Sequence, residues 1–189
     1  FFLNFPPGAS DLTPQSLFQL DAVHTMEFNR CSFTVCNLTA EGLPASRAVA
    51  LFELAPADEL AGLLFDLEPF PEMPAIRLTD CAARGQTSLV RSAQARPFYL
   101  TWDHGVFISS EQLVDVAGAI VEPPWDLGRV TLSLKRLVVF ADRGVAVMHT
   151  DSNAPYPTGM SVKAQACLFA TRLTKPPTPL YLYRGSSPL

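Results

Sequence analysis

Short runs of alternating apolar and polar residues, separated by proline, constrain this chain more than any other feature. The clearest run covers residues 129–140, where Val130 and Leu132 alternate with Thr131 and Ser133. A period of two is typical of a β-strand with one buried face. The chain's 17 prolines reinforce this interpretation, because proline is disfavoured inside helices and in central strands.

The same criteria apply along the whole chain. Strands are expected at 22–28, 30–35, 45–54, 75–78, 88–91, 98–102, 129–140, 145–150, 161–173 and 180–184. Residues 60–67 fit either a short helix or a buried strand. A further helix is expected over 113–117, because Ser109 followed by Gln112 resembles a capping box. The sequence therefore predicts a mainly β fold, a compact barrel or sandwich of about ten short antiparallel strands with one or two short helices.

The length of 189 residues fits one domain. Residues 1–20 are expected to form a hinge and N-terminal arm, because a Pro-Pro-Gly break at 6–8 interrupts them. Residues 21–189 are expected to form a single β-domain, with halves at 21–85 and 106–189 and a short connecting region at 86–105.

Charge argues against nucleic acid as a partner. The formal net charge is −4, and no basic cluster is larger than Lys135-Arg136. No apolar segment approaches the length of a membrane span, so no membrane insertion is expected. A short apolar start without a basic flank does not resemble a signal peptide.

No catalytic, metal or cofactor site is predicted. His24, His104 and His149 fall on separate predicted segments, and none has the spacing of a zinc motif. Phosphate-binding glycine loops and nucleophile elbows are missing from the sequence. We therefore expect a protein that is not an enzyme. Aromatic residues in loops are favoured interface anchors, so Trp125 and Tyr156 are the candidate interface residues.

Two sequence features are interpreted as structural. Cys31, Cys36, Cys81 and Cys167 lack CxxC spacing and are expected to be buried free thiols. Asn37-Leu38-Thr39 matches a glycosylation sequon, but such triplets are common by chance, and modification requires the secretory route.

Several segments together resemble the protruding domain of calicivirus major capsid proteins. The start, residues 1–7, is similar to the hinge before that domain, and residues 21–31 are similar to its strand ending in Arg-Cys. The proline-rich residues 64–75 and the Tyr-Pro-Thr-Gly turn at 156–159 also match in order. The outer subdomain inserted in that family has no room here, since only about residues 86–105 are available. The resemblance therefore implies a reduced form that lacks most of this insertion.

This resemblance implies a structural capsid domain that forms dimeric projections on a non-enveloped virion. Its expected partners are a second copy through an isologous interface, the shell domain of its own chain, and a host receptor or glycan. The expected location is the virion, and the host cytoplasm during assembly. Two alternatives stay open: the spike of another small RNA virus lineage, and a cellular all-β lectin-like binding module.

Overall fold

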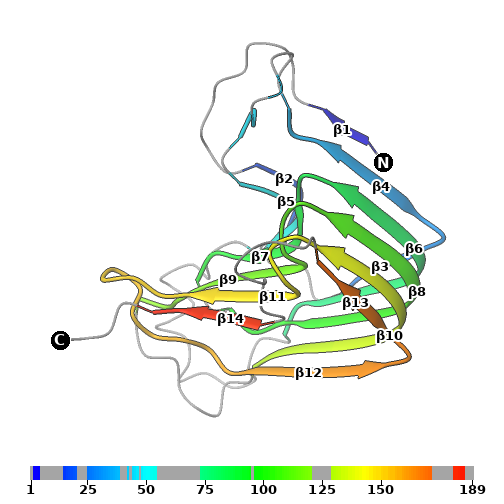
Figure 1. Cartoon of the computed structure of the whole chain (residues 1–189). Coiled ribbons are helices and arrows are strands. Elements are labelled where there is room, and N and C mark those ends of the chain that lie inside the picture. Colours follow the sequence, from blue (N-terminus) through cyan, green and yellow to red (C-terminus); the bar gives the residue numbers. More distant parts are fainter. Residues whose placement is uncertain are drawn as a thin grey trace.

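The computed structural model describes ten parts of the chain: residues 2–4, 15–20, 25–38, 42, 44–46, 48–54, 73–94, 96–120, 129–171 and 181–185. Fourteen strands and no helix lie in these ranges (Figure 1). Sheet A contains β1 (Phe2–Asn4), β3 (Thr25–Asn29), β4 (Ser32–Cys36), β6 (Ala75–Gly85), β8 (Tyr99–Ser109), β10 (Val130–Ala141), β12 (Met160–Gln165) and β13 (Leu168–Ala170). Sheet B contains β2 (Gln15–Leu20), β5 (Val49–Leu54), β7 (Ser88–Ser92), β9 (Val114–Ala117), β11 (Ala146–His149) and β14 (Tyr181–Arg184).

All strand pairs within the two sheets are parallel. The chain passes from sheet A to sheet B and back again, so each strand pairs with its counterpart one coil later. In sheet B, for example, the strand order is β14-β11-β9-β7-β5-β2. This arrangement is a parallel β-solenoid, in which each coil stacks on the one before it.

The predicted antiparallel barrel or sandwich is therefore wrong, although the chain is mainly β. Among the described residues, antiparallel pairing occurs only in two isolated bridges, Leu38 with Pro44 and Ala119 with Tyr156. The error has a physical cause. Alternation reports only that a strand has one buried face, and it does not report the direction of the neighbouring strand.

The coils of the solenoid have unequal lengths. Thr25 pairs with Ala75 50 residues later, and Ala75 pairs with Tyr99 after 24 residues. Tyr99 pairs with Thr131 after 32 residues, and Thr131 pairs with Ser161 after 30. Because the period varies, the repeated architecture leaves no fixed internal repeat in the sequence.

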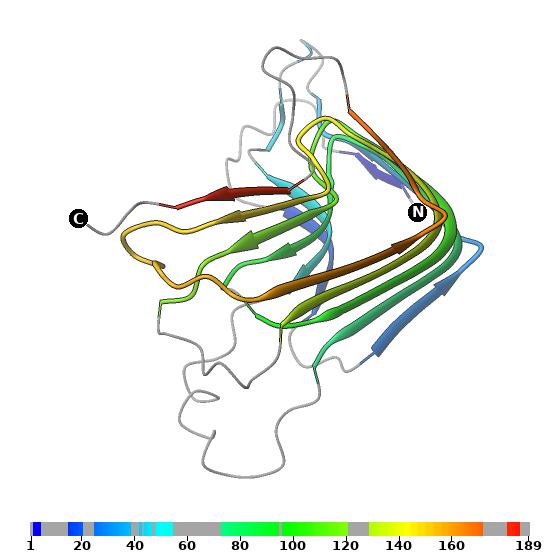
Figure 2. The ribbon, with the colours of Figure 1, turned by 60° about the horizontal axis from the view of Figure 1, so that its bottom comes forward.

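Each long strand of sheet A bends at one residue with a positive φ. Arg30, Asp80, His104, Arg136 and Ala166 have φ between 52° and 60°. Thr79 pairs with Asp103 and Cys81 with Gly105, so Asp80 and His104 stand side by side, and the same holds along the stack. The bend divides sheet A into a first arm before this residue and a second arm after it. Figure 2 shows the long strands following one curved path through the bend.

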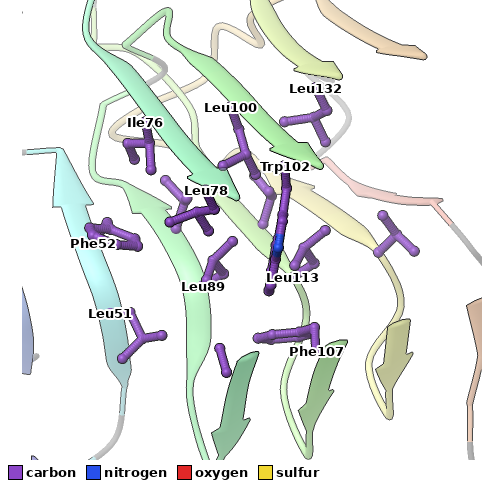
Figure 3. Close-up of a cluster of buried hydrophobic side chains, with 14 of the residues drawn as sticks. Leu51, Phe52, Ile76, Leu78, Leu89, Leu100, Trp102, Phe107, Leu113 and Leu132 are labelled. Carbon is purple, nitrogen blue, oxygen red and sulfur yellow. The ribbon is translucent and has the colours of Figure 1, made fainter. Parts of the chain in front are cut away.

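Side chains from both sheets fill the interior. Leu78, Leu100 and Trp102 of sheet A point toward Leu89 of β7 and Leu113, which directly precedes β9 (Figure 3). At the N-terminal side, Phe52 lies within 6.1 Å, between ring centroids, of Phe18, Phe28 and Phe33. Gly105 is required next to Trp102, because a Cβ there would lie 2.4 Å from the indole nitrogen and 2.2 Å from the Cys81 carbonyl oxygen.

The helix predicted over 113–117 is also wrong, because Val114–Ala117 is strand β9. Ser109 does accept the N–H of Glu111, at 3.0 Å, as a capping serine would. Its hydroxyl also donates to the Thr87 carbonyl, at 2.6 Å, and so ties together the corners of two coils. Ser109 therefore stabilises a turn and not a helix N-terminus. The β-branched Val114 and Val116 then favour the strand that follows the turn.

The structure also shows what the predicted domain boundaries contain. Residues 15–20, expected in an N-terminal arm, form β2 and pair with β5. Residues 86–105, expected to connect two halves, contain β7 and the first arm of β8, in the middle of both sheets. The ambiguous segment 60–67 lies outside the described residues.

Candidate binding face

The outer surface of the second arm of sheet A carries exposed apolar side chains in register. Val106 pairs with Val138, which pairs with Leu168, and Ile108 pairs with Phe140. Val106, Ile108, Val138 and Leu168 are 37%, 49%, 43% and 61% exposed, and Phe140 is half-buried. We call these five residues the apolar face. Exposed apolar clusters of this kind mark interaction sites on soluble proteins.

A charged ridge borders the apolar face along the bend. Nδ1 of His104 lies 2.5 Å from Oδ1 of Asp80, which accepts its hydrogen bond. On the neighbouring coils, Asp103 and Arg136 form an ion pair with 2.8 Å between Oδ1 and Nη2. The ridge therefore holds both signs of charge, and a polar, solvent-accessible border of this kind is typical of the rim of a protein interface.

The pKa of Asp80 is lowered from its ordinary value. The hydrogen bond with His104 is the largest cause; desolvation, the next largest effect, opposes it, and the charges of His104, Arg30 and Arg136 lower the pKa further. Asp80 is consequently an anion throughout the neutral range. The negative charge in the middle of the ridge is thus a fixed feature of this rim.

The outer side of sheet B carries a second set of charges, which are mostly covered. Glu53 and Arg91 are in register and lie 2.6 Å apart, with side chains only 19% and 11% exposed. Arg91 also donates to the Ala48 carbonyl, at 3.3 Å. Asp115 is in register with Arg91 and lies 3.3 Å from His149. These groups bind one another, so we interpret the cluster as a structural one.

Glu111 lies at the corner between the sheets, close to this cluster. Burial raises its pKa, and the charges of Asp115 and Asp142 add to the rise. The nearby guanidinium of Arg143, 3.3 Å from the carboxylate, opposes it. The ionised form of Glu111 is therefore less favourable in the folded chain than in water.

Of the two residues predicted as interface anchors, the structure describes only Tyr156, which does not belong to the apolar face. Tyr156 is 37% exposed and lies in a loop, where its backbone exchanges two hydrogen bonds with Ala119. Trp125 lies outside the described residues. Of the three histidines, His104 lies on the bend and His149 on sheet B, while His24 is outside the described ranges.

The structure describes Asn37 of the glycosylation sequon and all four cysteines. Asn37 is 6% exposed, donates to the Ser46 carbonyl at 2.9 Å and accepts from the Ser46 N–H at 2.8 Å. The Nδ2 atom to which a glycan would be attached is therefore on a buried side chain and already hydrogen-bonded. All four cysteines are free thiols, but only Cys81 is fully buried.

The sequence did not predict the apolar face, because interface residues were expected in loops and this face lies on strands. A signal was nevertheless present in residues 129–140. Alternation is clean up to Lys135, but Leu137, Val138, Val139 and Phe140 are all apolar. Such a continuous run in a strand means that both faces carry apolar side chains, and one of those faces is outside.

Within the described part of the chain, no group of three or more His, Cys, Asp or Glu side chains is placed to hold a metal ion. The same residues include no helix long and apolar enough to cross a membrane. Comparisons with family models, with curated proteins and with solved structures gave no match. The function is therefore argued from the chain's own geometry.

Proposed function

We propose that this chain is a structural assembly module, and that its apolar face pairs with the same face of a second copy. The observation that carries the proposal is the exposure of large apolar side chains in register on three successive coils. Strand spacing of about 4.8 Å and a residue rise of about 3.3 Å make this a flat, rigid patch. Burying it from water would favour association.

An isologous pair requires a surface that complements itself. The apolar rows of β8, β10 and β13 meet this requirement, because apolar side chains pack against their own kind. The ridge also meets it, because it contains both Asp80 and Arg136. A stable interface needs about 800 Å² from each partner, so the apolar face would be its centre and the ridge part of its rim.

A capsid projection, as inferred from the sequence, remains one structure of which such a module could be a part. It requires a dimerising, surface-exposed domain, which fits the proposed pairing. The antiparallel fold predicted from the strand pattern, which suited that family, is wrong, because the structure is parallel. The capsid assignment therefore keeps only its short sequence matches, and a shell domain encoded in the same polypeptide would be its direct support.

Lysine substitutions on two matched surfaces test the proposal. Ile108→Lys and Val138→Lys alter the apolar face, while Thr101→Lys and Ser133→Lys alter exposed outward positions on the first arm of the same strands. Burying an unpaired ammonium in an interface is costly, so the apolar-face variants should dimerise at least about tenfold more weakly, or about 1.4 kcal/mol.

Sedimentation equilibrium at micromolar concentrations is the measurement. We expect dimer for the wild type and for the two first-arm variants, and monomer for the two apolar-face variants. A wild type that remains monomeric, or first-arm variants that dissociate as readily as the others, would contradict the proposal.

A further inference from the structure

Two cysteines occupy the same position on neighbouring coils of sheet A. The first coil consists of β3 and β4, and the second is β6. Cys31 and Cys81 each directly follow the residue with a positive φ at which their coil bends. The ladders of β3 and β4 with β6 pair the residues on both sides of the bend, so the two cysteines lie in register. Neighbouring strands are about 4.8 Å apart, which is within the roughly 4.4–6.8 Å that separates the Cα atoms of disulfide-bonded cysteines.

The two side chains also share one orientation. The thiol of Cys31 donates to the Asn29 carbonyl, at 3.4 Å, and that of Cys81 donates to the Thr79 carbonyl, at 3.1 Å. Each sulfur thus reaches back to the carbonyl two residues before it. Cys81 is buried in the core, and the half-buried Cys31 packs against it. A disulfide requires that the two Cα–Cβ bonds do not point apart, and this pair meets that requirement.

The sulfur of Cys81 lies against the first coil. It accepts the N–H of Cys31, at 3.5 Å, and lies 3.5 Å from the Phe28 carbonyl oxygen. On the other side of Cys81, the next coil has Gly105 in register. The Trp102 indole fills the space that a side chain would take there, 2.4 Å from the place of a Cβ. The packing around Cys81 therefore directs its sulfur toward Cys31.

The other two cysteines are too distant to compete for this pairing. Cys36 lies five residues beyond Cys31 along the same coil, or about 16 Å at a rise of about 3.3 Å per residue. Cys167 lies at the bend between β12 and β13, three strands away from Cys81, which is about 14 Å. Of the four cysteines, Cys31 and Cys81 are therefore the pair that can be joined within the folded chain.

The two thiols differ in their access to solvent. Burial raises the pKa of the Cys81 thiol, and the charge and side-chain hydrogen bond of Cys31 add to the rise, while backbone hydrogen bonds with Cys31 and Thr79 oppose it. Cys81 therefore stays a protonated thiol at neutral pH. Cys31 is half-buried, so it is the thiol that an oxidant in solution reaches first.

We propose that Cys31 and Cys81 are a modification site, at which a peroxide forms a reversible disulfide that fastens the first coil of the solenoid to the second. The Cys31 sulfur gives an electron pair to one peroxide oxygen, the O–O bond breaks, and the departing hydroxide takes the thiol proton and leaves as water. Cys31 is then a sulfenic acid, which condenses with a neighbouring thiol.

The second step closes the bond. The Cys81 sulfur attacks the Cys31 sulfur, the S–O bond breaks, and the sulfenic hydroxyl leaves with the Cys81 proton as a second water. Two thiols and one hydrogen peroxide thus give one disulfide and two waters, and two electrons pass from sulfur to oxygen. The sulfurs must approach to about 2.05 Å, so Cys31 rotates away from the Asn29 carbonyl. Thiols are weak donors, so the loss of that hydrogen bond costs little.

The disulfide should stabilise the folded chain. It closes a loop from residue 31 to residue 81, and a link across about 50 residues strongly restricts the unfolded chain. For a protein of this size the expected effect is a Tm increase of about 8–16 °C. The bond lies inside the bend and not on the apolar face, so it does not depend on the proposed function.

The double variant Cys36→Ser/Cys167→Ser, which retains only this pair, provides the test. One equivalent of hydrogen peroxide should remove both thiols, as counted with a thiol reagent in denaturant, and lower the mass by two hydrogen atoms. Peptide mapping should find Cys31 linked to Cys81 in a protein that is still monomeric on a non-reducing gel. Thermal unfolding of the oxidised and dithiothreitol-reduced forms should then show the predicted difference in Tm.

Cys31→Ser in the same background is the matched control, because this position is half-buried and serine keeps its size. Peroxide should leave the Tm of this variant unchanged and its Cys81 thiol free. The proposal would be overturned if both thiols of the double variant survived peroxide, if Cys31 gained oxygen without linking, or if the link joined two chains. An oxidised form that unfolds no later than the reduced form would equally contradict it.

Discussion

Two ion pairs in this protein have the same register but differ strongly in burial, and their comparison gives a sharp prediction. Glu53–Arg91 and Glu27–Arg77 each join in-register neighbours on adjacent parallel strands. Their shortest N–O distances are 2.6 Å and 2.7 Å. The side chains of the first pair are 19% and 11% exposed, and those of the second are 62% and 59% exposed.

The consequence of losing the arginine should therefore differ severalfold. Arg91→Met leaves the Glu53 carboxylate largely buried without its cation, which should lower the free energy of unfolding by about 3–5 kcal/mol. Arg77→Met removes a pair that water already screens, for about 0.2–1 kcal/mol. For a chain of this size, 1 kcal/mol corresponds to about 2–4 °C in Tm, so the expected decreases are roughly 6–20 °C against at most about 4 °C.

Thermal and urea unfolding of the two variants, followed by circular dichroism, would measure the difference. The double variant Glu53→Met/Arg91→Met is the decisive control, because it removes both charges and should recover most of the lost stability. If Arg91→Met cost no more than Arg77→Met, or if the double variant were as unstable as the single one, our account of the sheet B cluster as structural would be refuted.

Three further substitutions test individual features of the fold. Ala166→Gly should raise the free energy of unfolding by up to about 1 kcal/mol in urea denaturation, since Ala166 has φ of 53°, and a decrease would contradict the assigned bend. Gly105→Ala should destabilise strongly in the same assay, because its Cβ would clash with the Cys81 carbonyl oxygen and the Trp102 indole; a neutral outcome would contradict the close packing of both groups against Gly105. Glu111→Gln concerns pH: the folded pKa is raised above 4.5, so ionisation costs stability above the folded pKa and costs nothing below 4.5. The variant should therefore be more stable relative to wild type at pH 7 than at pH 4, and a gain that is independent of pH would contradict the raised pKa.

The sequence predicted individual strands better than their arrangement. The alternation in 129–140 and the runs at 88–91 and 98–102 correspond to β10, β7 and β8, because local burial determines that pattern. Partner choice depends on contacts between residues 24 to 50 positions apart, which no short window contains. A repeat of fixed length in the sequence would have indicated a solenoid, but the coils differ in length, so no such repeat is present.

The site was harder to predict than the strands. The sequence favours the aromatic residues Tyr156 and Trp125 in predicted loops, whereas the apolar face consists of aliphatic residues and one phenylalanine within strands. Ile108 and Phe107 look alike in sequence, but Phe107 is fully buried and Ile108 is 49% exposed. Only the bend at His104, which shifts the alternation by one residue, decides which of them points inward.

The stacked parallel register supports both the apolar face and the matched ion pairs, so it is the central claim. Spin labels at outward positions can measure it directly. Thr101 is in register with Ser133, and Ser133 with Lys163. In a background with all four cysteines replaced by serine, labels at 101 and 133 should show strong dipolar broadening, as expected for strands about 4.8 Å apart. Labels at 101 and 163 should show weaker broadening, as expected at about 10 Å. Distances beyond about 20 Å for both pairs, or stronger broadening for 101 with 163, would contradict the solenoid.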